Sequence, residues 1–132
     1  IASFRLGVMH YHGDGVLQDY KKAIKFFKIA AEQNFAKAQY YLGFMHAEGL
    51  GVSQNYKQAV KWYRLAAEQG DALAQYKLGV MYYSGHGVPK NINETIRWWK
   101  LAAKQGDSHA KKNMDILLSE KSLWERVKDF FN

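Results

Sequence analysis

The sequence lacks several features that define whole classes of proteins. None of its 132 residues is cysteine and only one is proline. Without cysteine there are no disulfides, thiolate metal sites or cysteine nucleophiles, and the redox compartment stays open. No apolar run approaches the roughly 20 residues that span a bilayer, and no basic stretch followed by an apolar one marks a secretory signal.

The residues that are present describe one basic domain of ordinary size. Apolar residues make up 48% and charged residues 23% of the chain, as in soluble globular proteins. The formal net charge of +7 suits acidic proteins, anionic lipid or nucleic acid, and by itself it selects none of them.

A 36-residue repeat organises the chain. A leucine–glycine pair recurs at one phase: Leu6-Gly7, Leu42-Gly43 and Leu78-Gly79. An alanine pair recurs at another: Ala30-Ala31, Ala66-Ala67 and Ala102-Ala103. We therefore expect a single domain over 1–132, with repeats at about 1–35, 36–71 and 72–107, a partial repeat at 108–119 and a capping helix at about 122–131. Because the chain begins inside a repeat, at Ile1, we also expect a fragment or processed form with further repeats upstream.

The stretch HYHGDGV, residues 10–16, has the composition of a metal site or a phosphate-binding loop. Its copies read HAEGLGV and YYSGHGV, so only the two glycines and the valine recur. His10 and His12 are two residues apart and point to opposite sides of a helix, which does not suit one ion. A G-x-G without a third glycine or a preceding strand is a weak phosphate signal. We interpret the glycines as structural links between helices and expect no metal: Gly13, Gly15, Gly49, Gly51, Gly85 and Gly87.

Each repeat predicts two helices, here called A and B. In the middle copy, apolar residues recur at helical spacing over 36–48, and a second helix follows between Asn55 and Gly70. Asn55 and Asp71 are typical N-caps, and Asn91 with Glu94 reads as a capping pair. Asn34 occupies the phase of Gly70 and Gly106, where a left-handed conformation is expected. No segment alternates as a half-buried strand does.

Glycine recurs inside each A helix, at Gly7, Gly43 and Gly79, where it costs about 1 kcal/mol relative to alanine. We expect a neighbouring helix to approach closely there. Small residues should face that approach: Ala23, Ala30, Ala59 and Ala66. Phe26, Trp62 and Trp98 share another phase and should fill the space between pairs. Because stacked pairs bury an apolar face that one pair leaves open, the predicted fold is an all-α solenoid of stacked antiparallel helix pairs.

The pattern A-x-x-x-L-G-x-M-[YH]-x-x-G-x-G-V, followed by K-A-x-x-W-[YW]-x-x-A-A, resembles the Sel-one-like repeats (SLR), a branch of the tetratricopeptide (TPR-like) superfamily. The resemblance covers Ala2 to about Met114. It implies a right-handed superhelix with the A helices on the concave wall, and a scaffold or adaptor role in protein–protein interaction. Such proteins are common in bacteria and in eukaryotic membrane-associated degradation complexes.

The sequence departs from this pattern in its last third. Glu94-Thr95 replaces lysine–alanine, so the third B helix should pack differently. Met114-Asp115 replaces leucine–glycine, which indicates that the array stops. Leu123, Val127 and Phe130 or Phe131 share one face of the expected capping helix, which Ser122 and Glu125 would begin as a capping box. An amphipathic helix for a membrane or a partner is the alternative, although the acidic residues dilute its basic face.

The resemblance assigns three phases of the A helices to a concave groove that would bind a peptide or helix of another protein. The candidate groove residues are Phe4, Val8, Tyr11, Tyr40, Phe44, Tyr76, Val80, Tyr83 and Lys112, and the same phases include Ala47, Ile116 and Ser119. Aromatic residues in a groove dominate interface energetics. Packing between adjacent A helices is the alternative, and apolar periodicity does not separate the two.

Nucleic-acid binding and catalysis are the alternative functions. Basic rows run along the B helices: Lys25, Lys61 and Arg97, and Lys28, Arg64 and Lys100. We expect a solvated face there, because a nucleic-acid surface interleaves aromatics that here belong to the core. No catalytic set is present. One cysteine-rich branch of the family is associated with β-lactamase activity. Because this chain has no cysteine, that association is only weak support for the same activity here. We expect no enzyme, cofactor, small-molecule substrate or membrane partner.

Overall fold

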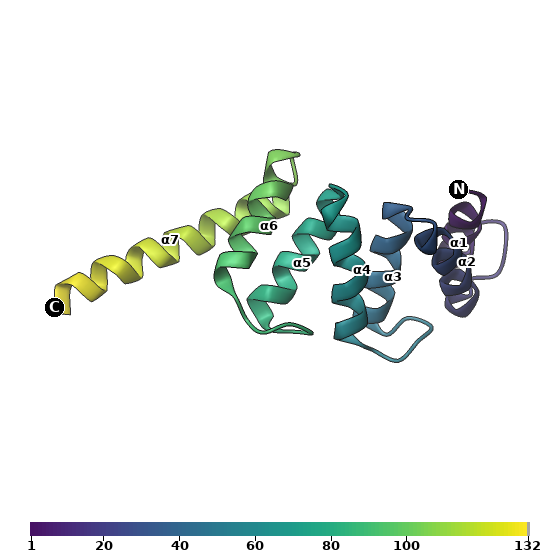
Figure 1. Ribbon diagram of the computed structural model, residues 1–132, viewed down its shortest axis with the longest axis horizontal. Coiled ribbons are helices and arrows are strands. Elements are labelled where there is room, and N and C mark those ends of the chain that lie inside the picture. The colour runs from purple at the N-terminus through teal and green to yellow at the C-terminus, as the bar shows by residue number, and fades with distance from the viewer. Residues whose placement is uncertain (132) are drawn as a thin grey trace.

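The computed structural model describes residues 1–131, apart from the side chains of residues 123, 124, 126 and 129–131. Its helices are α1 (Ala2–His12), α2 (Tyr20–Glu32), α3 (Ala36–Glu48), α4 (Tyr56–Glu68), α5 (Ala72–Ser84), α6 (Ile92–Lys104) and α7 (Ser108–Phe131). The described residues contain no strand. Each helix packs against its neighbours in sequence, and Figure 1 shows them following one another along the long axis, with the termini at opposite ends. The all-α solenoid is confirmed.

The helix ends follow the local signals in the sequence. The side-chain oxygens of Asn55, Asp71 and Asn91 accept hydrogen bonds from backbone N–H groups three residues on, at 3.1, 3.0 and 3.1 Å. Asn34 is left-handed, with φ of 68°, as predicted. Only one half of the expected capping pair forms. The Asn91 side chain caps the helix, but the Glu94 carboxylate pairs with Arg97 at 3.2 Å.

The G-x-G links have two separate structural roles. The first glycine ends each A helix in a left-handed conformation, as at Gly49 with φ of 70°. The second lies against the preceding repeat: a Cβ at Gly51 would stand 2.8 Å from the backbone carbonyl carbon of Tyr20, and one at Gly87 would meet the backbone oxygen of Tyr56 at 2.5 Å. The link therefore seats each repeat on the B helix of the one before it.

The mid-helix glycines are places of close approach, as predicted, but the group that approaches is an aromatic ring. A Cβ at Gly43 would stand 2.6 Å from Cδ1 of Tyr63. The same contact recurs one repeat away in both directions, between Gly7 and Phe27 and between Gly79 and Trp99. The four alanines expected to face this approach are all buried.

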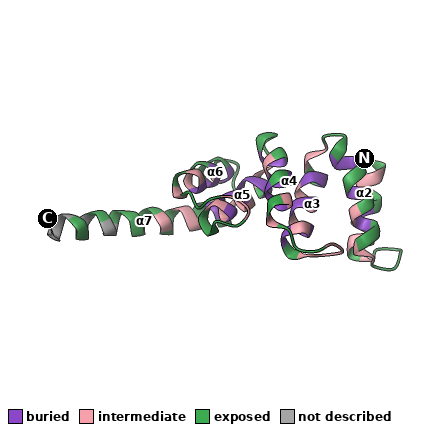
Figure 2. Ribbon diagram, turned by 60° about the horizontal axis from the view of Figure 1, so that its bottom comes forward, coloured by how far each residue is buried: buried purple, intermediate pink, exposed green. Residues whose placement is uncertain are grey.

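The core runs along the array as clusters between neighbouring helices, which Figure 2 shows as purple faces turned toward one another. Trp62 of α4 packs with residues of α2 and α3, and Trp98 of α6 packs with residues of α4 and α5. Each tryptophan thus fills the space between its own pair and the preceding one. Phe26, at the same phase in the first pair, is half-buried and stacks on His10 at 5.4 Å.

The C-terminal part differs from the prediction. Instead of a partial repeat at 108–119 and a separate helix from 122, α7 runs unbroken over Ser108–Phe131. Neither glycine nor proline occurs in this range, so nothing interrupts a helix once it has formed, and Ser122 and Glu125 lie inside it.

The two halves of α7 have different surroundings. Ala110, Met114 and Leu117 pack against α6 and cover the last pair, whereas the distal half projects beyond the array (Figure 1). Asp115 is exposed, and so is Val127. The side chains of Leu123, Phe130 and Phe131, which we expected on the capping face, lie outside the described residues.

Across the described part of the chain, no helix combines the length and apolar character that crossing a membrane requires.

Candidate partner-binding surface

The predicted groove residues lie on α1, α3, α5 and α7, which supply the A-helix wall. At its N-terminal end, Phe4, Val8 and Tyr11 are half-buried against the cluster formed by α2 and α3. The Phe4 ring lies 4.9 Å from the Phe35 ring. Tyr11 lies 5.4 Å from Tyr41. Much of their area is therefore used in packing between helices.

In the middle of the wall, Tyr40 and Phe44 are also half-buried. Tyr40 lies 5.9 Å from Tyr63 of α4, and its pKa is raised to about 12, mainly by burial and next by the charge of Asp71. The ammonium group of Lys77 lies 5.5 Å from the centre of the Phe44 ring. A cavity of about 180 Å³ opens beside these residues, lined in part by Lys77, Val80 and the buried Ala47.

The C-terminal end of the wall contains the larger pocket, with a volume of about 310 Å³. Its lining comes from α5, α6 and α7: Tyr76, Val80, Tyr83, Trp99, Asn113, Ile116, Leu117 and Glu120. The structure therefore brings three of the predicted groove residues, Tyr76, Val80 and Tyr83, together with Ile116 from the same set of phases. Lys112 is exposed and does not line the pocket.

The Trp99 side chain forms the inner wall of this pocket. Its ring lies 5.9 Å from Tyr76 and 6.2 Å from Tyr83, and its Nε1 donates a hydrogen bond to the Tyr76 carbonyl at 3.0 Å. Asn113 Nδ2 donates to the Tyr76 hydroxyl at 2.9 Å. These bonds hold the aromatic rings in fixed positions, with tyrosine and tryptophan each keeping a polar partner.

One repeat position, which was not among the predicted groove residues, determines where the A-helix wall is open. In the first junction it holds Tyr41, which stacks on Phe27 at 4.8 Å. One repeat later it holds Lys77, and one more repeat later the short Asn113. The side chain that would fill the space shrinks along the array, and the pocket appears at the third position. Trp99, Leu117 and Glu120 were missed as well. Trp99 occupies the same repeat position as Phe27 and Tyr63, so the 36-residue spacing is the sequence signal that identifies it.

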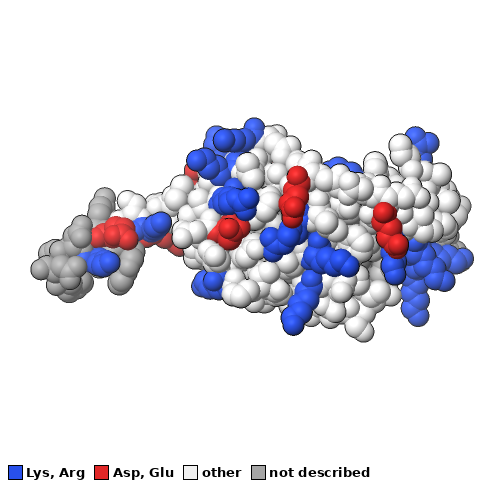
Figure 3. Space-filling model, in the orientation of Figure 1, with Lys and Arg blue, Asp and Glu red and all other residues white. Residues whose placement is uncertain are grey.

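The outer wall carries the basic rows, and cations from these rows lie over three aromatic rings. Lys61, Arg64 and Arg97 lie over the rings of Trp62, Tyr82 and Trp98 at 5.1, 5.6 and 4.7 Å. Figure 3 shows lysine and arginine side chains recurring along one face, with single acidic side chains between them. These three rings are therefore covered by cations rather than open for stacking on bases.

The histidines near the N-terminus are placed apart from one another. His10 Nδ1 donates to the Leu6 carbonyl at 2.9 Å, and His12 is exposed. Among the described residues, no group of three or more histidines, aspartates or glutamates is arranged to hold a metal ion.

Comparison with known proteins gives a consistent result. The Sel1 repeat family model matches residues 1–35, 36–71 and 72–107. Among solved structures, a protective antigen of uropathogenic Escherichia coli with an SLR fold is 37% identical, with a TM-score of 0.90 over 91% of this chain and 26% of that one. A Sel1 repeat protein from Oxalobacter formigenes is 40% identical, with a TM-score of 0.83 over 87% of this chain and 47% of that one.

A more distant structure is cysteine-rich protein B of Helicobacter pylori, which is 25% identical, with a TM-score of 0.68 over 72% of each chain. A search of curated proteins gave no match. This chain spans less than half the length of the first two solved relatives. Sel1 repeat proteins are generally non-enzymatic scaffolds for protein interaction. With three repeats matched over most of its length, the chain belongs to the Sel1 repeat family.

Proposed function

We propose that the chain is an adaptor that binds a peptide or helix of a partner protein on its A-helix wall, anchored in the pocket between α5 and α7. The observation that carries this proposal is an aromatic-lined pocket of about 310 Å³, at a repeat position where the side chains of the chain itself leave space. Interface hot spots concentrate in such pockets, where large apolar side chains lose contact with water.

The size and lining of the pocket suit one large side chain of a protein partner. Its volume lies at the lower limit of pockets that hold small molecules, about 300 Å³. Tyr83 and Ile116 at its mouth are 42% and 48% exposed, so a partner would cover apolar area there. Asn113 and Glu120 supply polar groups that would orient the incoming chain.

The other predicted residues extend this surface rather than form its anchor. Tyr40 and Phe44 would continue the contact across the smaller cavity beside Lys77, and Lys112 offers an exposed cation at the C-terminal end. Phe4, Val8 and Tyr11 would contribute only their exposed edges. The proposal assigns the chain no catalytic step, cofactor or small-molecule substrate.

The test uses Tyr83→Ala, because Tyr83 is exposed and its replacement leaves the core intact. Partners captured by the purified wild-type protein are identified by mass spectrometry, and the affinity of one purified partner is then measured by calorimetry. We expect Tyr83→Ala to weaken that affinity by about tenfold or more. Tyr40→Ala and Tyr76→Ala extend the test along the wall, with circular dichroism to check folding.

Leu73→Ala is the matched control. Leu73 lies on the same helix, is 41% exposed, and does not line the pocket. A partner that binds Tyr83→Ala as tightly as the wild type, while the fold is retained, would place the binding surface elsewhere.

A further inference from the structure

Another cavity lies on the outer wall, at the junction of the first two repeats. It has a volume of about 290 Å³ and lies between α2, α3 and α4, away from the aromatic pocket. Its apolar lining is Ile24, Leu42, Val52 and Trp62, and its polar lining is Lys28, His46, Gln58 and Lys61. We call it the outer cavity.

The polar side chains of the outer cavity lack hydrogen-bond and ion-pair partners among the described residues, although the Lys61 ammonium lies over the Trp62 ring. Nδ1 of His46 is shielded from solvent and has no hydrogen-bond partner, unlike Nδ1 of its counterpart His10. Neither Lys28 nor Lys61 is among the ion pairs formed by the described residues. No carboxylate lines the cavity, so two cations and an imidazole face one space without a counter-charge.

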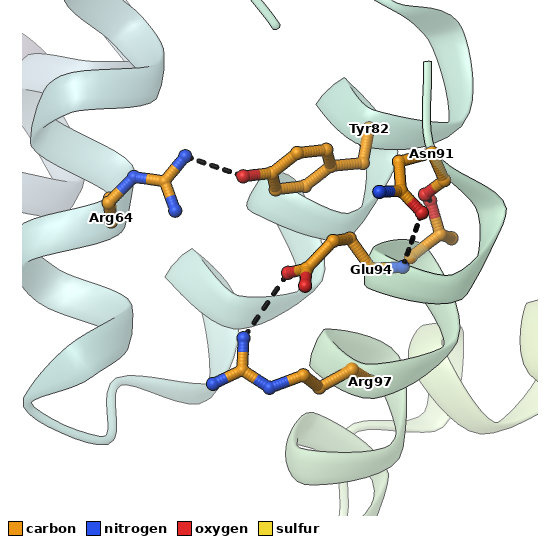
Figure 4. A network of polar contacts seen from close by, with 6 residues as sticks. Arg64, Tyr82, Asn91, Glu94 and Arg97 are labelled. Carbon is orange, nitrogen blue, oxygen red and sulfur yellow. Dashed lines mark hydrogen bonds and ion pairs between the residues drawn. The ribbon is translucent and has the colours of Figure 1, made fainter. Parts of the chain in front are cut away.

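The next junction along the array shows how the same positions are satisfied. Shifted by one repeat, the four polar positions hold Arg64, Tyr82, Glu94 and Arg97. Arg64 Nη2 donates to the Tyr82 hydroxyl at 2.6 Å, and Glu94 accepts from Arg97 at 3.2 Å (Figure 4). The second junction contains its own carboxylate, at the position where the first has the neutral Gln58.

We propose that the outer cavity binds a carboxylate side chain from an acidic segment of a partner protein. The bound carboxylate would take the place that Glu94 has in the next junction, accepting hydrogen bonds from the ammonium groups of Lys28 and Lys61 and from the Gln58 amide. Charge-assisted bonds of this kind are the stronger ones in proteins. Ile24 and Trp62 would contact the methylene groups of the acid.

This proposal goes beyond the partner-binding function above, because it concerns the opposite wall and a different chemistry. It predicts a second contact for a protein partner, with specificity for acidic rather than apolar side chains. Either proposal stands if the other fails.

His46 provides a built-in reporter for the bound carboxylate. Its pKa is lowered, first by burial and then by the charge of Lys28. The charged groups lining the cavity are Lys28 from α2 and Lys61 from α4, and the charge of Lys28 opposes protonation of the imidazole. A carboxylate acts in the reverse direction, so binding should raise the pKa of His46 and should strengthen as the pH falls through its titration.

The experiment is an NMR titration of the ¹⁵N-labelled protein with a blocked tetrapeptide that has two central glutamates, compared with the same peptide carrying glutamines. We expect the glutamate peptide alone to shift resonances of His46 and Gln58 and to raise the pKa of His46. Lys61→Gln should weaken its binding about tenfold. Lys57→Gln, the same charge change on an exposed residue of the same helix, should leave it unchanged.

Gln58→Glu tests the proposal without removing a cation. It copies Glu94 into the first junction, so it should raise the pKa of His46 in the free protein and block the glutamate peptide. Three outcomes would overturn the proposal: equal binding of both peptides, equal loss in Lys61→Gln and Lys57→Gln, or shifts that map to Tyr83 instead of His46. A response to inorganic phosphate with none to the glutamate peptide would overturn it too.

Discussion

Three pairs, each of a glycine and an aromatic ring, set the distance between the helices of each repeat. Gly7, Gly43 and Gly79 are buried within their helices, and the ring that contacts each comes from the B helix of the same repeat. Glycine is unfavourable in a helix, but it lets a large ring lie directly on the backbone and bury its face. The recurring loss in helix propensity is offset by the packing of the ring.

Gly43→Ala should therefore destabilise the protein by about 1–3 kcal/mol, although alanine is the better helix former. The added methyl would stand 2.6 Å from the ring of Tyr63, which is 1% exposed. Urea unfolding measures the difference. Combining it with Tyr63→Leu should reduce the penalty of the alanine, because the clash is then removed. A stabilisation near 1 kcal/mol in Gly43→Ala would show that propensity outweighs packing.

Tyr63 also links stability to alkaline pH. Burial raises the pKa of its hydroxyl far above the ordinary value of tyrosine. A pKa that is higher in the folded than in the unfolded chain stabilises the fold fully below the unfolded value, about 10, and less as the pH rises above it. We expect the free energy of unfolding to fall above pH 10, and to fall less steeply in Tyr63→Phe. Urea unfolding from pH 8 to 11 measures both slopes, with the exposed Tyr83→Phe as control. Equal slopes in all three proteins would argue against the buried hydroxyl.

Helix boundaries were predictable because they depend on a few neighbouring residues. An N-cap needs one side-chain oxygen near a free N–H, and a left-handed end needs glycine or asparagine, so both can be read locally. The break predicted near residue 121 was wrong for a related reason. A capping box marks a helix start only where no helix is already propagating, and α7 reaches Ser122 from its packed N-terminal half.

Asn91→Ala should lower the stability of the protein by about 1 kcal/mol, because it removes the cap of α6. Asn93→Ala, an exposed position in the first turn of the same helix, should have almost no effect. Thermal unfolding followed by circular dichroism compares the two. A similar change in both variants would mean that the 3.1 Å bond from the Glu94 N–H adds nothing to stability.

Across the whole solenoid, stability depends on neighbours, because each helix packs mainly on those next to it along the chain and otherwise on the adjacent repeat. The α1 helix buries only Gly7, whereas α3 buries residues along most of its length. The distal half of α7 lies outside the array (Figure 1). Protection of the backbone amides from hydrogen exchange should therefore be unequal along the chain.

Amide hydrogen exchange should be slowest in α3, α4 and α5 and faster in α1 and the end of α7, since end elements open at lower free energy. Mass spectrometry of peptic fragments measures the rates. Uniform protection from α1 to α6 would instead indicate that the array opens only as one cooperative unit.

The candidate surfaces were less predictable than the fold. Tyr76, Val80 and Tyr83 were identified from their phase, and they do line the large pocket. Phe4 has the same phase as Tyr76, yet it packs against Phe35 and Tyr41 instead. Periodicity places a residue on a face, but whether that face is open depends on the sizes of side chains from other helices.

By itself, the sequence determined the repeat period, the helix pairs, their caps and links, and hence the solenoid, because these depend on local conformation and on a regular apolar pattern. Only the tertiary structure decided where the solenoid is open. The pocket forms where three helices surround Asn113 in place of Tyr41 or Lys77, and the outer cavity forms where Gln58 stands in place of Glu94. Both depend on volume and charge summed over neighbours that are distant in sequence.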